Sequence, residues 1–137
     1  MEPKKGQISV EYLVIIGFVT IVVIGILGIA LVYSGAIKDK IKISQVTSFA
    51  NKIISTSESV FYAGAPSKST ISVYLPENVE EILIIEDSLI ISIQTSTGKN
   101  RISFSSKVPI SGNLGISSGL KKIKIEAGSE RVDITPA

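Results

Sequence analysis

One long stretch near the start of the chain is apolar on every side of a helix. Residues 12–37 read YLVIIGFVTIVVIGILGIALVYSGAI, which is 26 residues without a charged side chain. A helix of that length extends roughly 39 Å, whereas the hydrocarbon core of a bilayer is about 30 Å thick. A core helix of a small domain would carry a polar stripe, and this stretch has none. It is also too long for the apolar region of a cleaved secretory signal. The pattern therefore predicts a helix that can span a membrane.

Beyond this run the helical pattern continues but becomes amphipathic. Apolar residues recur at spacings of three and four, with lysines and a glutamate between them. This stripe comprises Ile37, Ile41, Val46, Phe49, Ala50, Ile53, Ile54, Val60 and Phe61. The first strong helix breaker is the Ala-Gly-Ala-Pro segment at 63–66. One helix is thus predicted from about 8 to 62, and its outer half needs a partner for the stripe.

From residue 69 onward the apolar period changes to two, which is typical of half-buried strands. Alternating or β-branched runs predict strands at 71–75, 82–85, 89–93, 102–105, 122–126 and 131–134. Turns are predicted at 86–88 and 127–130, and loops at 76–78 and 109–119. The fold class is therefore α+β, with an antiparallel β-sheet of about five to seven strands over 64–137. We expect one face of this sheet to pack on the helix stripe, because so small a sheet makes a thin core alone.

Composition limits the chemistry that the chain can perform. It contains no His, Cys or Trp, which excludes disulfides, thiolate or imidazole metal sites, and catalysis by His or Cys. Its 14 basic and 12 acidic residues give a formal charge of only +2, and no basic stripe with interleaved aromatics occurs, so nucleic acid is not an expected partner. No Asn is followed by x-Ser/Thr, so there is no N-glycosylation sequon. We expect a protein that is not an enzyme and uses no cofactor.

The carboxylates of the predicted sheet are of the residue type that binds calcium. They are Glu77, Glu80, Glu81, Glu86 and Asp87. Solvated charge at turns and sheet edges explains them more simply, so no metal site is expected.

The first twelve residues carry the most specific signal. Two lysines and a glycine precede a polar motif that leads into the apolar run, in the order Lys4, Lys5, Gly6, Gln7, Ser9, Glu11 and Tyr12. The lysines by themselves predict an N-terminus in the cytoplasm and a β-rich head outside. Together, Lys-Lys-Gly and Gln-x-Ser-x-Glu-Tyr closely resemble the class III signal peptide of archaeal type IV pilin precursors.

The resemblance implies processing by a prepilin peptidase, an aspartic protease of the membrane. Cleavage between Gly6 and Gln7 would remove the leader at 1–6 and leave a helix at 7–63 and a β-rich head at 64–137. In this family the carboxylate at the position of Glu11 is thought to pair with the N-terminal amine of a neighbouring subunit, here on Gln7. An unpaired charge so close to hydrocarbon is costly, so pairing would set the register of the next subunit.

The resemblance also implies polymerisation, with an assembly ATPase and a membrane platform protein as partners besides other copies of the chain. Subunits would leave the bilayer and exchange lipid contacts for contacts between helices. Ser9 and Tyr12 are assigned to recognition or helix packing. Four glycines would allow close helix approach or bending, although glycine is common in any membrane helix; they are Gly17, Gly25, Gly28 and Gly35.

The first hypothesis is therefore a structural subunit of an adhesion-type pilus, held in the cytoplasmic membrane as a precursor and extracellular in the mature filament. A minor pilin or a pilin-like single-pass membrane protein is the main alternative, together with an archaellum-type filament subunit. The motif and the small head favour the adhesion-type pilus over the archaellum. A membrane-anchored binding protein or enzyme is a remote alternative.

Overall fold

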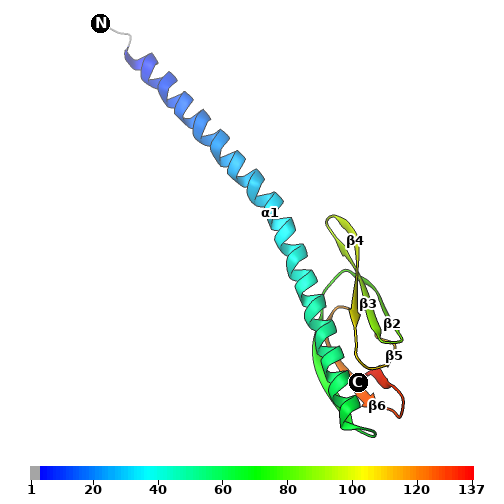
Figure 1. The fold of residues 1–137 in the computed structure, drawn as a ribbon. Helices are drawn as coiled ribbons and strands as arrows, with labels where there is room; N and C mark the ends of the chain where they lie inside the picture. The colour runs from blue at the N-terminus through cyan, green and yellow to red at the C-terminus, as the bar shows by residue number, and fades with distance from the viewer. Residues whose placement is uncertain (1–3) are drawn as a thin grey trace. The chain divides into compact units, whose positions relative to one another are not determined.

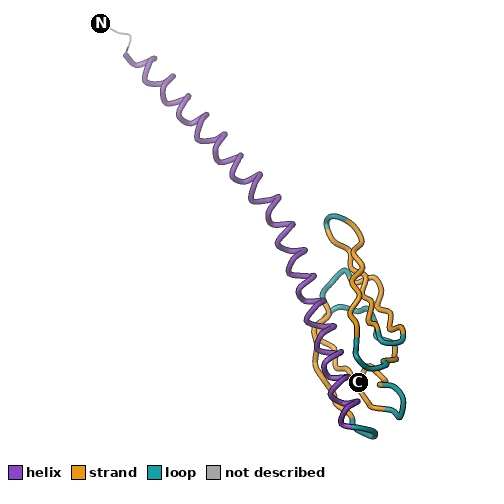
Figure 2. Tube along the Cα trace, in the orientation of Figure 1, coloured by secondary structure: helices purple, strands orange, loops and turns teal. Residues whose placement is uncertain are grey.

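The computed structural model describes the backbone of residues 4–137 and the side chains of residues 9–137. A single helix is followed by seven strands (Figures 1 and 2), which are α1 (Lys4–Ala63), β1 (Lys68–Leu75), β2 (Val79–Ile85), β3 (Ser88–Thr95), β4 (Gly98–Ser105), β5 (Ile110–Gly112), β6 (Gly119–Ala127) and β7 (Val132–Pro136). The predicted α+β class is confirmed, with the order of elements of a type IV pilin. By compactness the chain divides into Met1–Lys38 and Asp39–Ala137, and we call the second unit the head unit.

Helix α1 ends where the sequence predicted and begins four residues earlier. Its last residue is Ala63, after which Gly64 adopts a φ of +84° and its N–H donates to the Phe61 carbonyl over 3.0 Å. A positive φ is readily adopted only by glycine, so Gly64 stops the helix. At the other end the helix begins at Lys4, whereas the apolar pattern predicted a start near residue 8.

Within the head unit, one stripe of α1 is buried against the strands. Its members are Val46, Phe49, Ala50, Ile53, Ile54, Ser57 and Val60. The Ser57 hydroxyl is satisfied inside the helix, because it donates to the Ile53 carbonyl over 2.8 Å. The predicted stripe is wrong at its first two positions, because Ile37 and Ile41 are 56% and 52% exposed. Ile41 lies about 200° around the helix from Asp39, the residue at this level that contacts the strands.

The strands form two sheets rather than the one that was expected. The larger has the order β1-β6-β7-β5 and the smaller the order β2-β3-β4. After β1 the chain builds the smaller sheet as a meander of two hairpins and then returns to complete the larger one. All pairs are antiparallel except β5 and β7, which run parallel.

Strand β5 occupies part of a segment that was predicted to be a loop. Its three residues pair with β7 from Ile110↔Val132 to Gly112↔Ile134. Gly112 has a φ of +143°, and a Cβ at this position would lie 1.9 Å from the Ile134 carbonyl oxygen. Only glycine permits such an approach, so the small residue that suggested a loop is what lets this strand form.

Both sheets and the helix stripe share one hydrophobic core. The inward residues alternate along β1 and β6 as predicted, whereas on β3 three consecutive residues are buried, Ile91, Ser92 and Ile93. The fully buried apolar residues of the strands include Leu75, Leu89, Ile91, Ile93, Ile123, Ile125, Val132 and Ile134. The two predicted hairpins are confirmed: Glu86 and Asp87 connect β2 to β3, and residues 128–131 connect β6 to β7. The head unit is therefore a helix segment covered by two thin sheets.

Three polar contacts join α1 to the strands along this packed segment. The Asp39 carboxylate accepts both the backbone N–H, at 3.0 Å, and the hydroxyl of Ser96 at the tip of the β3–β4 hairpin. Lys52 Nζ donates to the Ser72 carbonyl on β1 at 3.0 Å, and Glu58 Oε1 accepts the Lys107 N–H at 3.0 Å. They border the apolar stripe at its beginning, middle and end.

Candidate functional site: the exposed apolar helix

The first half of α1 presents apolar side chains on all its faces. Over the described side chains from Ser9 to Lys38 none is buried, and the large apolar ones are between 42% and 76% exposed. This helix is long and apolar enough to cross a membrane. Water would impose a large free-energy cost on so much apolar surface, so the segment requires lipid or the apolar surface of another protein. The predicted helix is thus confirmed to be long and apolar enough to cross a membrane.

Two tyrosines mark the length that lipid would cover, and only one of them belonged to the predicted site. Tyr12 and Tyr33 are both exposed and lie 21 residues apart. At 1.5 Å per residue they are about 31 Å apart along the helix, close to the hydrocarbon thickness of a bilayer. Tyrosines are enriched at both membrane interfaces, so this spacing is typical of a spanning helix. The aromatic spacing is a sequence signal by which Tyr33 could have been found.

Within this span the one threonine is satisfied by the helix itself. Thr20 Oγ1 donates to the Ile16 carbonyl at 2.7 Å. In hydrocarbon every polar group needs an internal partner, and a hydroxyl that bonds back to the preceding turn meets this requirement.

The predicted processing residues lie at the edge of what the structure describes. Met1–Pro3 of the leader lie outside the described residues, and so do the side chains of Lys4, Lys5 and Gln7; Gly6 has none. The backbone of these last four belongs to the first turn of α1. A protease that binds extended backbone would have to unwind this turn, whose N–H groups have no partners within the helix.

The predicted assembly residues Ser9, Glu11 and Tyr12 are all exposed on α1. Glu11 forms no hydrogen bond or ion pair with any described side chain. Its carboxylate lies on the exposed surface of α1.

The four predicted helix-packing glycines leave open space beside the helix. A Cβ added at Gly17, Gly25, Gly28 or Gly35 would meet no atom within 4 Å. At 100° per residue Gly17, Gly28 and Gly35 fall within about 20° of one line along the helix, while Gly25 is about 80° away. Three glycines thus share a face on which another helix could approach closely.

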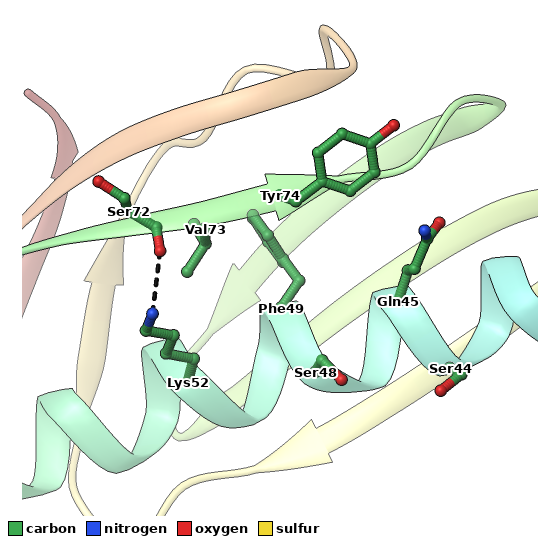
Figure 3. A pocket seen from close by; sticks show the side chains of 8 residues that line it. All are labelled: Ser44, Gln45, Ser48, Phe49, Lys52, Ser72, Val73 and Tyr74. Atoms are coloured by element: carbon green, nitrogen blue, oxygen red, sulfur yellow. Dashed lines mark hydrogen bonds between the residues drawn. The ribbon is translucent and has the colours of Figure 1, made fainter.

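The head unit offers shallow grooves rather than an arrangement of reactive groups. One groove of about 220 Å³ lies between α1 and β1 (Figure 3). Phe49 and Val73 are the apolar residues of its lining, and Lys52 donates a hydrogen bond across one end to the Ser72 carbonyl. Within the described residues no three His, Cys, Asp or Glu side chains come close enough to hold a metal ion.

No family model, no curated protein and no solved structure matches this chain.

Proposed function

We propose that this chain is the structural subunit of an archaeal type IV pilus of the adhesion type. The observation that carries the proposal is the contrast between the two halves of α1. The outer half has its own apolar partner in the strands, whereas residues 9–38 have none within the described chain. A helix that first meets lipid and later meets identical helices satisfies the same apolar surface in both environments.

The proposed sequence of events starts from the leader. The precursor lies in the cytoplasmic membrane with its N-terminus inside and its head outside. A prepilin peptidase cleaves after Gly6, and the amine of Gln7 becomes the new N-terminus. An assembly ATPase and a membrane platform protein then move the subunit into an extracellular filament. The resemblance of the first twelve residues to a class III signal peptide supports this order.

The exposed carboxylate of Glu11 supports pairing between neighbouring subunits. After cleavage, the amine of Gln7 in one copy supplies a positive charge for Glu11 in another. A buried ion pair of this kind loses most of its stabilisation when one partner is removed, because the other charge is left unpaired in an apolar core. The pair would therefore select a correctly registered subunit over an unregistered one.

The test is a mass-spectrometric measurement of the mature N-terminus, combined with electron microscopy of cell-surface filaments. Wild type should give a chain that begins at Gln7 and filaments that contain it in quantity. Glu11→Ala should still be cleaved but assemble poorly, and Glu130→Ala, which removes an exposed carboxylate from the β6–β7 turn, should assemble as the matched control. A cleaved chain present only in traces in filaments would favour a minor pilin. An uncleaved chain confined to membranes would contradict the proposal.

A further inference from the structure

Two exposed patches on the head unit carry opposite charges beside apolar side chains. The first, which we call the basic patch, lies on the outward face of β1 and β6 and consists of Tyr74, Leu120 and Lys122. Tyr74 and Leu120 are direct cross-strand partners, 48% and 74% exposed, and Lys122 follows two residues later on the same face of β6. Exposed apolar side chains that adjoin one another offer a surface that a partner can cover.

No ion pair with a described side chain neutralises the charge of the basic patch. Its neighbour Lys124 pairs with Glu126 at 2.6 Å, whereas Lys122 has no ion pair with a described side chain. The adjacent Lys121 donates to the Gly115 carbonyl and the Ser117 hydroxyl, neither of which carries a charge. The patch is therefore positively charged.

The second patch, which we call the acidic patch, lies at the β2–β3 turn and consists of Leu83, Ile85, Glu86 and Asp87. Leu83 and Ile85 point outward from β2, and Ile85 is 52% exposed. Neither carboxylate of the turn has an ion pair with a described side chain. The turn is held in place by its carbonyls, since Glu86 accepts the Ile110 N–H at 2.8 Å and Asp87 accepts the Ser106 N–H at 2.6 Å.

The patches lie at different levels along α1. Tyr74 borders the groove lined by Gln45 and Phe49. The acidic patch is tied to Ser106, and the next residue, Lys107, donates to Glu58. The 9 to 13 helical residues between these levels correspond to roughly 14–20 Å along the helix axis. Between copies whose helices run parallel, the acidic patch of one can therefore meet the basic patch of the other only if the copies are displaced along this axis.

From this complementarity we infer that the head binds a second copy of the chain head-to-tail, with the basic patch of one copy on the acidic patch of the next. A two-fold contact through either patch alone would place like charges opposite each other. A head-to-tail contact pairs opposite charges and leaves one patch free at each end, so it extends into an open assembly. The inference rests on the proposed filament.

The patches are small compared with the surface of about 800 Å² per partner that stable complexes usually bury. The head contact is accordingly weak alone and becomes effective when the helices of neighbouring copies already hold the heads close together. It fixes the position of each head relative to its neighbour, in addition to the position that the pairing of helices sets.

Cysteine cross-linking tests this contact directly, because the chain has no cysteine of its own. The full-length double variant Leu120→Cys/Ile85→Cys should give a ladder of disulfide-linked multimers on whole cells treated with a mild oxidant. The control Leu120→Cys/Thr97→Cys moves the second thiol to the exposed β3–β4 turn and should give no ladder. In the cross-linking background, Lys122→Glu should lower the ladder yield about tenfold, and adding Glu86→Lys and Asp87→Lys should restore it.

The outcomes separate this contact from the proposed function. Filaments that contain the double variant but give no ladder overturn the head contact and leave the pilus subunit intact. Absence of filaments in wild-type cells overturns the pilus subunit and, with it, the head contact that depends on the filament. A ladder that charge reversal leaves unchanged, or that the control pair also gives, overturns the proposed pairing of these two patches.

Discussion

Asp39 on α1 binds Ser96 at the tip of the β3–β4 hairpin through two hydrogen bonds to one carboxylate oxygen, although the two residues are 57 positions apart in the sequence. The Ser96 hydroxyl is the main reason why the pKa of Asp39 lies below its ordinary value of 3.8, with smaller contributions from the Ser96 N–H and from Lys42. Partial removal from water acts in the opposite direction. The contact therefore involves the charged form of Asp39.

This contact gives the hairpin tip a predictable dependence on pH. Because the folded pKa is lower than the unfolded one, the stabilisation is complete above about pH 4 and disappears as the pH falls through the folded pKa. Hydrogen exchange should show a protected Ser96 amide between pH 5 and 8 and lose this protection in Asp39→Ala. Ser96→Ala keeps the amide donor and should lose protection only in part; equal protection in all three proteins would show that the contact does not hold the tip.

Replacement of Gly112 by alanine should destabilise the head severely. The new Cβ would lie 1.9 Å from the Ile134 carbonyl oxygen and the backbone would be held at a φ of +143°. We expect a loss of about 3–5 kcal/mol in the free energy of unfolding, measured by chemical denaturation of the full chain in detergent. Gly119→Ala is the control, because its φ is also positive, at +112°, but its Cβ would meet open space. A cost similar to that of Gly119→Ala would mean that β5 can move away from β7 at little expense.

The helix stripe can be tested by truncation at Phe49. This side chain is 2% exposed in the shared core, so Phe49→Ala should lower the free energy of unfolding by about 3–5 kcal/mol. The same experiment on Ile41→Ala should change it by less than about 0.5 kcal/mol, because the Ile41 side chain is 52% exposed and lies outside the core. Similar effects at both positions would argue against the observed boundary of the packed segment.

The proposed insertion into a membrane depends on the uncharged run. A lysine at its centre, Ile24→Lys, adds about 2.5–3.5 kcal/mol to the free energy of insertion and should shift much of the chain out of alkali-washed membranes. Ile41→Lys makes the same chemical change outside the run and should remain in the membrane fraction. Full retention of Ile24→Lys would indicate that lipid does not surround this part of α1.

The sequence predicted the class of fold because each element carries a local signal. Each of these signals is contained in one short stretch of sequence. Examples are the uncharged run, the helix breaker at Gly64 and the alternation at Ile123 and Ile125. The hairpin at Glu86 and Asp87 was also predicted, since its two strands are neighbours in sequence and in space.

What the sequence did not predict depends on residues far apart in the chain. Alternation shows which face of a strand is buried but not which strand lies next to it, so the division into two sheets was missed. Strand β5 exists because Ile110 pairs with Val132, and three residues have no period of their own. The contact between Asp39 and Ser96 has no periodic signal either. Among the predicted assembly residues, the structure adds that Glu11 is exposed.

The spacing of the three polar contacts between α1 and the strands has a mechanical consequence. Asp39, Lys52 and Glu58 are distributed over 19 helical positions, about 29 Å, and the buried stripe fills the space between them. Tension applied along α1 therefore loads these contacts together, in shear, instead of opening them one after another from an end. The head is built to stay on its helix under pulling until all of the contacts fail at once.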